Sequence, residues 1–362
     1  MTNNQMTEID ELSRKTIQGL KPYSSTPRDE SSDVIYLNAN ENPYPREYAL
    51  LSKEFNRYPE PQPSRLIENY AAFLGVNPDN ILVSLGGDES IKLIIEAFCE
   101  PRDEAILYCP PTFGMYDISA RVVGVNSIEV PLDKDFNLDV AGIKNALDNT
   151  ETNVKVIFLC SPNNPTGNSM DRAAMIEILE AAKGRAIVVI DEAYIEFSDQ
   201  KTDSVTDLIN TYPHLAIIRT LSKAFGLAGI RCGFTVGSKA LIDVLKKVIA
   251  PYPIPIPVID IATQTVNEAG IAEMWRVVDK IKALKAELKT DLEALSIVKK
   301  VYKSDTNWLL VEVSDASAIF NYLLQNNIHV RDQRGVLQNM LRISIGTREE
   351  NRRLIDVLKT YP

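Results

Sequence analysis

Residues 219–233 read RTLSKAFGLAGIRCG and directly follow the apolar run LAII at 215–218. The apolar run is typical of a buried strand, so Lys223 comes directly after a strand. A lysine in such a place becomes a nucleophile when its surroundings lower its pKa, and imine formation with an aldehyde is the usual use. An isolated Ser-Lys pair is more often a solvated surface turn, so the rest of the chain has to decide between the two interpretations.

The residues around Lys223 favour an aldehyde that carries a phosphate. Ser222 precedes the lysine, and Arg231 follows near the end of the stretch. Both side chains can donate hydrogen bonds to a phosphate, and an arginine can do so through two parallel bonds. A hydroxyl, a lysine and an arginine in this order therefore suggest pyridoxal 5′-phosphate as the cofactor.

Length and composition indicate a globular protein of roughly two domains, with 362 residues of which 45% are hydrophobic and 24% charged. The formal net charge is −10 and like charges form no long block, so neither nucleic acid nor an anionic membrane is an expected partner. Residues 1–20 are polar, and no apolar run reaches the length of a membrane span. We therefore expect a soluble cytoplasmic protein.

The cysteines are far apart in sequence, and each lies in or beside an apolar segment. No pair has the spacing of metal ligands, and only His214 and His329 could assist. We therefore expect buried, reduced thiols and no metal. The cysteines are Cys99, Cys109, Cys160 and Cys232.

From residue 81 onward, short apolar runs alternate with helical patterns, which predicts an α/β fold with a parallel-rich mixed sheet between layers of helices. The proline-dense segment PYPIPIP at 251–257 is the natural domain boundary. We predict an N-terminal arm at 1–34, a large cofactor-binding domain at 35–250 and a small α+β domain at 251–362, to which the arm contributes. The small domain is expected to begin with a long helical stretch over about 258–295.

Candidate site residues follow the carboxyl ends of the predicted strands. Open α/β sheets bind ligands at that edge. Because these segments are far apart in sequence, their shared position is the strongest structural argument for a site. The residues are Gly86 and Gly87, Phe113, Asn164, Asp191 and Lys223.

The phosphate and the ring face of the cofactor each have a candidate partner. Gly87, Asp88 and Glu89 open a predicted helix, where free backbone N–H groups and the helix dipole favour a phosphate. The two carboxylates would then have to point away, and the alternative is that Asp88 simply caps the helix. Phe113 follows two prolines and could stack on the ring, or could be a core aromatic.

The polar atoms of the cofactor ring also have candidate binding partners in the sequence. Asn164, in the uncommon string SPNNPTG at 161–167, and Tyr194 could both bond the ring hydroxyl. Asp191 ends an apolar run and needs a cationic partner, which a protonated pyridine nitrogen supplies; the alternative is an N-cap. Lys223, once released by an amine substrate, could carry the proton between the substrate Cα and the cofactor C4′.

The chain resembles the fold-type I aminotransferases, and among them the histidinol-phosphate aminotransferases, over residues 23–350. Phe113 departs from the pattern, because many relatives carry tyrosine there. The matching strings are LNANENP (37–43), RYP (57–59), PPTFGMY (110–116), SPNNPTG (161–167), DEAY (191–194), TLSKAFGLAGIR (220–231), VRDQ (330–333) and LRIS (341–344).

The resemblance implies a homodimer with active sites at the subunit boundary. Tyr58 would reach the cofactor phosphate of the other subunit, and the arm with Tyr23 would help to close over the substrate. Arg331 and Arg342 would hold the substrate phosphate and the carboxylate of glutamate. Two further residues of the matching strings would contribute, Asn40 to the substrate and Thr220 to the cofactor.

The reaction implied is the reversible conversion of histidinol phosphate and 2-oxoglutarate into imidazole-acetol phosphate and glutamate, a step of histidine biosynthesis. Three alternatives remain open at this point. An aromatic amino-acid or dual-specificity aminotransferase shares these motifs. A threonine-phosphate decarboxylase uses the same scaffold on a phosphorylated amine. A regulator that binds the cofactor without catalysis is the third, although such a protein would be expected to carry a nucleic-acid-binding module.

Overall fold

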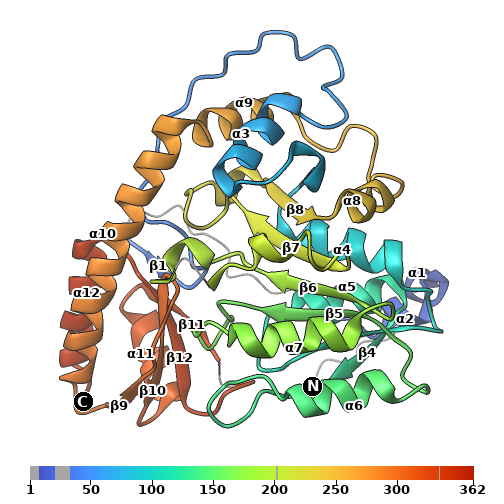
Figure 1. Ribbon diagram of the computed structural model, residues 1–362. Helices are drawn as coiled ribbons and strands as arrows, with labels where there is room; N and C mark the ends of the chain where they lie inside the picture. The colour runs from blue at the N-terminus through green and yellow to red at the C-terminus, as the bar shows by residue number, and fades with distance from the viewer. Residues whose placement is uncertain (1–7, 21–32, 201–202, 334) are drawn as a thin grey trace.

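The computed structural model describes residues 8–20, 33–200, 203–333 and 335–362 and contains two β-sheets with helices packed around them (Figure 1). The larger sheet has the strand order β2-β8-β7-β6-β5-β3-β4. Neighbouring strands from β3 to β7 are parallel, and β8 is antiparallel to both β7 and β2. Strands β2 to β7 therefore end at one edge, as the sequence predicted. The strands are β2 (Ile81–Ser84), β3 (Ala105–Tyr108), β4 (Asn126–Glu129), β5 (Val154–Cys160), β6 (Ile187–Asp191), β7 (Leu215–Thr220) and β8 (Gly233–Gly237).

Helices cover both faces of this sheet because its inner strands are apolar on both sides. Successive residues of a strand point to opposite faces. In β5, Val156 and Phe158 accordingly join one core, whereas Ile157 and Leu159 join the other. The first core contains α4 (Gly87–Phe98), α5 (Met115–Val123) and α8 (Lys239–Leu245), and the second contains α3 (Ser64–Leu74), α6 (Val140–Asp148) and α7 (Arg172–Ala182). The predicted α/β fold is thus confirmed.

The smaller sheet has the order β1-β11-β12-β10-β9 and is antiparallel except for the parallel pair β1 and β11. The long helix α10 runs beside it, next to α12 (Figure 1). Strand β1 pairs with β11, although the predicted division placed residues 35–37 in the first domain. The division into an arm and two domains stays a prediction. The elements are β1 (Ile35–Leu37), β9 (Val298–Val301), β10 (Trp308–Val313), β11 (Ile328–Asp332), β12 (Met340–Ser344), α10 (Glu268–Glu293), α11 (Ala316–Gln325) and α12 (Arg348–Lys359).

The long helical stretch predicted over about 258–295 consists of two helices in the structure. Helix α9 (Ile256–Thr265) ends before α10 begins. The Asn267 side chain caps α10 by accepting a hydrogen bond from the Gly270 N–H at 2.8 Å. A Cβ on Gly270 would lie 2.1 Å from the Thr265 carbonyl oxygen, so glycine permits the close approach of the two helices.

Two short N-terminal helices, α1 (Glu8–Leu12) and α2 (Lys15–Gln18), precede the sheets.

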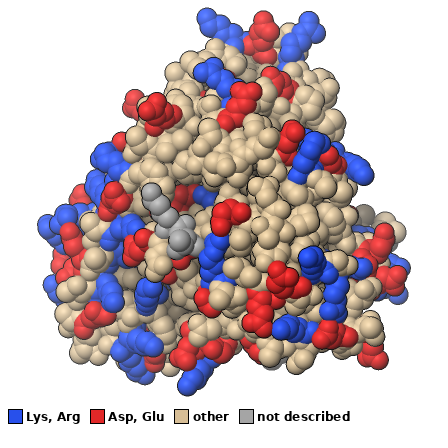
Figure 2. Space-filling view, in the orientation of Figure 1, with Lys and Arg blue, Asp and Glu red and all other residues tan. Residues whose placement is uncertain are grey.

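The four cysteines are free and buried. On the face shown in Figure 2, acidic and basic side chains are interspersed. Within the described ranges, no helix is both long enough and apolar enough to span a bilayer.

Candidate active site

Lys223 follows β7 and lines a cavity of about 560 Å³ to which both sheets contribute. Its Nζ donates a hydrogen bond to the Ala39 carbonyl oxygen, 2.9 Å away, in the loop after β1. The cavity walls include Tyr36, Asn38, Asn40, Phe113, Asn164, Tyr194, Lys223, Arg331, Gln333 and Arg342.

Burial and positive neighbours lower the pKa of Lys223 to about 8. Loss of hydration is the largest cause, and the Arg342 guanidinium is the next. The carboxylates of Glu41 and Asp88 act in the opposite direction. Near neutral pH, a larger fraction of this amine is therefore unprotonated than of an exposed lysine, as nucleophilic attack requires.

Asp191 ends β6, the strand that pairs with β7, and its side chain is buried. Its Oδ2 accepts a hydrogen bond from the Tyr116 hydroxyl at 2.8 Å, and its Oδ1 accepts one from the Ala193 N–H at 3.1 Å. Burial raises the pKa of Asp191 to about 6, although both hydrogen bonds oppose the rise. A cation placed beside such a carboxylate offsets its desolvation, so the site suits the predicted pyridinium nitrogen.

The start of α4 lies beside the Arg231 guanidinium. The helix begins at Gly87, and the first N–H groups of a helix lack partners within the helix. Gly86 has a φ of +85°, and a Cβ there would lie 2.8 Å from the Arg231 Nη2, so only glycine lets the guanidinium approach. The Ser222 Oγ lies 3.5 Å from the Arg231 Nη1 and accepts a hydrogen bond from the Thr220 hydroxyl at 2.9 Å.

The acidic side chains of the first turn both have partners close to the start of the helix. Gly86 is the N-cap of α4, so Asp88 does not cap it. The Asp88 carboxylate instead pairs with the Arg231 Nη2 at 3.2 Å. The Glu89 carboxylate reaches back and accepts a hydrogen bond from the Leu85 N–H at 2.6 Å. An anion bound to the backbone amides of this turn would therefore share Arg231 with Asp88.

A polar cluster at the cavity wall joins Asn164 to Arg342 and Tyr194 to Asn40. The Asn164 Oδ1 accepts a hydrogen bond from the Arg342 Nη1 at 2.5 Å, so the NH2 group of the asparagine remains a donor. The Tyr194 hydroxyl accepts from the Asn40 Nδ2 at 3.4 Å. The Lys223 Nζ lies 5.6 Å from the centroid of the Tyr194 ring.

Arg331 and Arg342 lie directly opposite each other on the antiparallel strands β11 and β12. Residues paired in this way project from the same face of a sheet, and two like charges so placed repel. Both side chains line the cavity. An anion between them would relieve the repulsion, so the pair suits a substrate phosphate or carboxylate.

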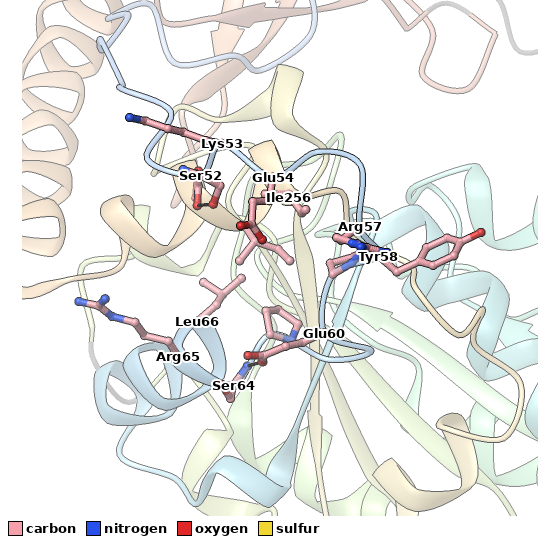
Figure 3. Close-up of a pocket in the computed structure, with 14 residues that line it drawn as sticks. Ser52, Lys53, Glu54, Arg57, Tyr58, Glu60, Ser64, Arg65, Leu66 and Ile256 are labelled. Carbon is pink, nitrogen blue, oxygen red and sulfur yellow. Dashed lines mark hydrogen bonds between the residues drawn. The ribbon is translucent and has the colours of Figure 1, made fainter.

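The lining of this cavity does not include every predicted site residue. Those absent from its walls are Gly87, Asp88, Glu89, Asp191, Thr220, Ser222, Arg231 and Tyr58. Tyr58 is 80% exposed and stacks on Tyr252, with ring centroids 4.5 Å apart. It lines a separate hollow with Glu60 and Ser64, and its ring points away from the middle of that hollow (Figure 3). Tyr23 lies outside the residues that the structure describes.

Sequence reasoning missed the residues that hold the loop at 38–41 over Lys223. The Asn307 Nδ2 donates to the Asn40 carbonyl oxygen at 2.9 Å, and the Ser344 hydroxyl donates to the Asn40 Oδ1 at 3.1 Å. The Arg342 Nη2 donates to the Asn38 carbonyl oxygen at 2.7 Å. Polar residues next to or within an apolar strand were the available signal, namely Asn307 directly before β10 and Ser344 in β12, both of them buried.

The family model for class I and II aminotransferases matches residues 29–358, nearly the whole chain. The chain belongs to this aminotransferase family. The aminotransferase is 52% identical to histidinol-phosphate aminotransferase 1 of Pasteurella multocida over 353 residues, which cover 97% of this chain and 99% of the relative. It is 48% identical to histidinol-phosphate aminotransferase 1 of Haemophilus influenzae strain 86-028NP, over the same shares of the two chains.

Solved structures share the fold of the aminotransferase. A histidinol-phosphate aminotransferase from Clostridium acetobutylicum matches with a TM-score of 0.80 and 24% identity, over 90% of this chain and 98% of that one. A histidinol-phosphate aminotransferase from Sinorhizobium meliloti in complex with pyridoxal 5′-phosphate has a TM-score of 0.80 and 22% identity, over 91% of each chain. The expectation of pyridoxal 5′-phosphate as cofactor is confirmed by the family.

The polar and charged groups around Lys223 match the functional groups of this cofactor. The amides at the start of α4, Ser222 and Arg231 would hold its phosphate, Asp191 its ring nitrogen, and Lys223 its aldehyde. When bound, pyridoxal 5′-phosphate takes up the amino group of a substrate and withdraws electrons from the substrate carbon. The lowered pKa of Lys223 suits its Nζ to take a proton from that carbon and return it.

Proposed function

We propose that this aminotransferase transfers the amino group of histidinol phosphate to 2-oxoglutarate, forming imidazole-acetol phosphate and glutamate in histidine biosynthesis. The relatives named above, at 48–52% identity over 97% of the chain, support this substrate. The observation that carries the proposal is the arginine pair, Arg331 opposite Arg342, in the cavity that also contains Lys223. Both amino donors in the reaction are amines that carry an anion, which such a pair can recognise.

The two arginines lie at different depths in the cavity. Arg342 is buried, donates to Asn164, and is the positive charge that lowers the pKa of Lys223 most. Arg331 is more exposed. We infer that Arg342 binds the anionic group nearest the reacting carbon, and that Arg331 closes around the same group from the solvent side. Asn40 would both orient Tyr194 and bind the substrate, because its NH2 group keeps a second N–H beyond the bond to Tyr194.

The test is a half-reaction on cofactor-loaded protein, in which each amino donor is added without an acceptor and the absorbance of the bound cofactor is followed. Histidinol phosphate and glutamate are expected to convert the cofactor to its amine form rapidly, and phenylalanine far more slowly. Conversion by phenylalanine at an equal or higher rate would assign the protein to aromatic substrates instead. Release of carbon dioxide from O-phosphothreonine would point to a decarboxylase.

We also propose a cytoplasmic homodimer in which Tyr58 bonds the phosphate of the partner's cofactor. Its exposed, stacked ring on a proline-supported loop supports a contact outside its own chain. Large apolar side chains are exposed in the same region, as expected for a surface covered by a second copy. They are Leu50, Leu51, Phe55 and Tyr252.

Light scattering after gel filtration is expected to give twice the chain mass of 40.4 kDa. Tyr58→Phe is expected to weaken cofactor binding by about tenfold through loss of one hydrogen bond to a charged group. Tyr252→Phe is the matched control, since its ring still stacks on Tyr58. A monomer that retains full cofactor affinity would refute the shared site.

A further inference from the structure

Tyr116 lies outside the residues that the sequence assigned to the site, yet its hydroxyl donates the hydrogen bond to Asp191 Oδ2 at 2.8 Å. The side chain is in the first turn of α5 and fully buried. Its ring stacks on Phe158, with centroids 4.7 Å apart and planes at 11°, and meets Phe113 edge to face at 5.7 Å and 87°. The phenol oxygen is therefore fixed by packing on two sides.

The Asp191 carboxylate is held through both of its oxygens. Tyr116 binds one oxygen, and the Ala193 N–H binds the other at 3.1 Å. One bond to each oxygen fixes the plane of a carboxylate, which otherwise turns freely about its last torsion. Each oxygen has a second lone pair, so a cation can still bind.

We propose that Tyr116 is a positioning residue that holds the Asp191 carboxylate in the orientation in which it pairs with the protonated ring nitrogen of the cofactor. The inference rests on the proposed cofactor role of Asp191. Phe113 has no hydroxyl and contributes only a ring to this cluster. The phenol that bonds the acid comes from Tyr116, in the first turn of α5.

The electrostatics of the site agree with this role. The hydrogen bond from Tyr116 is the largest influence that keeps the pKa of Asp191 from rising further on burial. Its loss would extend protonation of Asp191 to higher pH. The other titratable or charged groups that face Asp191 come from α4, β5 and the segments after β6 and β7, and are Asp88, Cys160, Tyr194 and Lys223.

The test compares Tyr116→Phe with the wild-type protein in equilibrium binding of two cofactors, after removal of the native one. The first cofactor is pyridoxal 5′-phosphate, and the second is its analogue with carbon in place of the ring nitrogen. Tyr116→Phe is expected to bind pyridoxal 5′-phosphate about tenfold or more weakly, as for loss of a hydrogen bond to a charged group. Both proteins are expected to bind the analogue within about twofold of each other, because no ring nitrogen is left to couple to Tyr116.

The matched control is Tyr108→Phe. The Tyr108 hydroxyl also donates to a carboxylate, the Glu129 Oε1 at 2.5 Å, but this pair lies on β3 and β4 at the far side of the sheet. The control should bind both cofactors as the wild type does. The Tyr116→Phe ring keeps its aromatic contacts, and its thermal unfolding with bound cofactor checks that the fold is intact.

If Tyr116→Phe weakens the binding of both cofactors equally, Tyr116 has only a packing role and the proposal is overturned. Unchanged binding of both cofactors would also overturn it. A second variant, Asp191→Asn, distinguishes failure of the Tyr116 proposal from failure of the proposed contact between Asp191 and the ring nitrogen. If Asp191→Asn binds pyridoxal 5′-phosphate as tightly as the wild type, then Asp191 does not pair with the ring nitrogen, and the proposed cofactor contact fails with it. Nuclear magnetic resonance of cofactor labelled with ¹⁵N in the ring gives a second readout: the nitrogen should lose its proton at lower pH in Tyr116→Phe than in the wild type.

Discussion

Lys223→Ala is expected to reduce turnover at least about 10⁴-fold, because one side chain both binds the cofactor aldehyde and moves the proton at the substrate carbon. Its pKa of about 8 and its hydrogen bond to Ala39 place an amine that loses its proton easily at the cavity wall. The measurement is the rate of the half-reaction with glutamate. In the wild type, borohydride reduction followed by peptide mass spectrometry is expected to find the cofactor on Lys223.

The pH dependence of cofactor capture tests the cause of this effect. Only the unprotonated amine attacks an aldehyde, so the initial rate of capture by cofactor-free protein should rise about tenfold per pH unit below the pKa of Lys223. Above about pH 8 the rate should level off. A rise that continues toward the ordinary pKa of lysine would contradict the lowered value.

Lys285→Met is the matched control for Lys223→Ala. Burial also lowers the pKa of Lys285 to about 8, but its Nζ donates to the carbonyl oxygens of Ser304 and Thr306 at 2.6 and 2.7 Å, outside the cavity. The variant is expected to lose stability but to keep its cofactor and its half-reaction. Retained amino transfer in Lys223→Ala would refute the assignment of the lysine.

The position of the site could be predicted from sequence because strand ends are local features. Lys223, Asp191 and Asn164 each follow an apolar run, and the parallel order of β5, β6 and β7 brings those ends together. Only the assumption of a parallel sheet was needed. The same reasoning failed at β4 and β9, whose sequences NSIE and VKKV are polar because most of their side chains are exposed or half-buried.

Residues that act through tertiary contacts could not be found in the same way. A tyrosine on the apolar face of a helix is typical of a core position, so nothing in the sequence connects Tyr116 with Asp191. The opposition of Arg331 and Arg342 depends on the register of β11 with β12, which the residues between them do not specify.

Arg219→Met is expected to lower the free energy of unfolding by about 3–5 kcal/mol, because it leaves two buried carboxylates without their cation. The Arg219 Nη1 lies 2.9 Å from the Glu192 Oε2, and its Nη2 lies 2.7 Å from the Glu196 Oε1. The side chains are 5%, 0% and 2% exposed, respectively. Denaturant unfolding with saturating cofactor in both samples measures the loss.

The loss of unfolding free energy caused by Arg219→Met should increase as the pH rises. Burial raises the pKa of Glu192, and Arg219 is the largest opposing influence, so the pKa rises further in the variant. A carboxyl group whose pKa is higher in the folded than in the unfolded chain binds more protons when folded, and stability then falls with increasing pH. Unfolding near pH 8 should therefore show a larger difference from the wild type than unfolding near pH 5. A deficit that is the same at both values would contradict this cause.

Two comparisons separate the buried charge from the loss of an ordinary ion pair. Arg276→Met removes an exposed pair with Glu273 on α10 and is expected to cost less than about 0.5 kcal/mol. Adding Glu192→Gln and Glu196→Gln to Arg219→Met removes all three charges and should recover part of the loss, because neutral amides cost less to bury than unpaired carboxylates.

Glu192 follows Asp191, and Arg219 precedes Thr220, so the ion pair joins β6 and β7 beside the cofactor contacts. Arg219→Met should accordingly weaken cofactor binding as well, and the triple variant should restore both properties together.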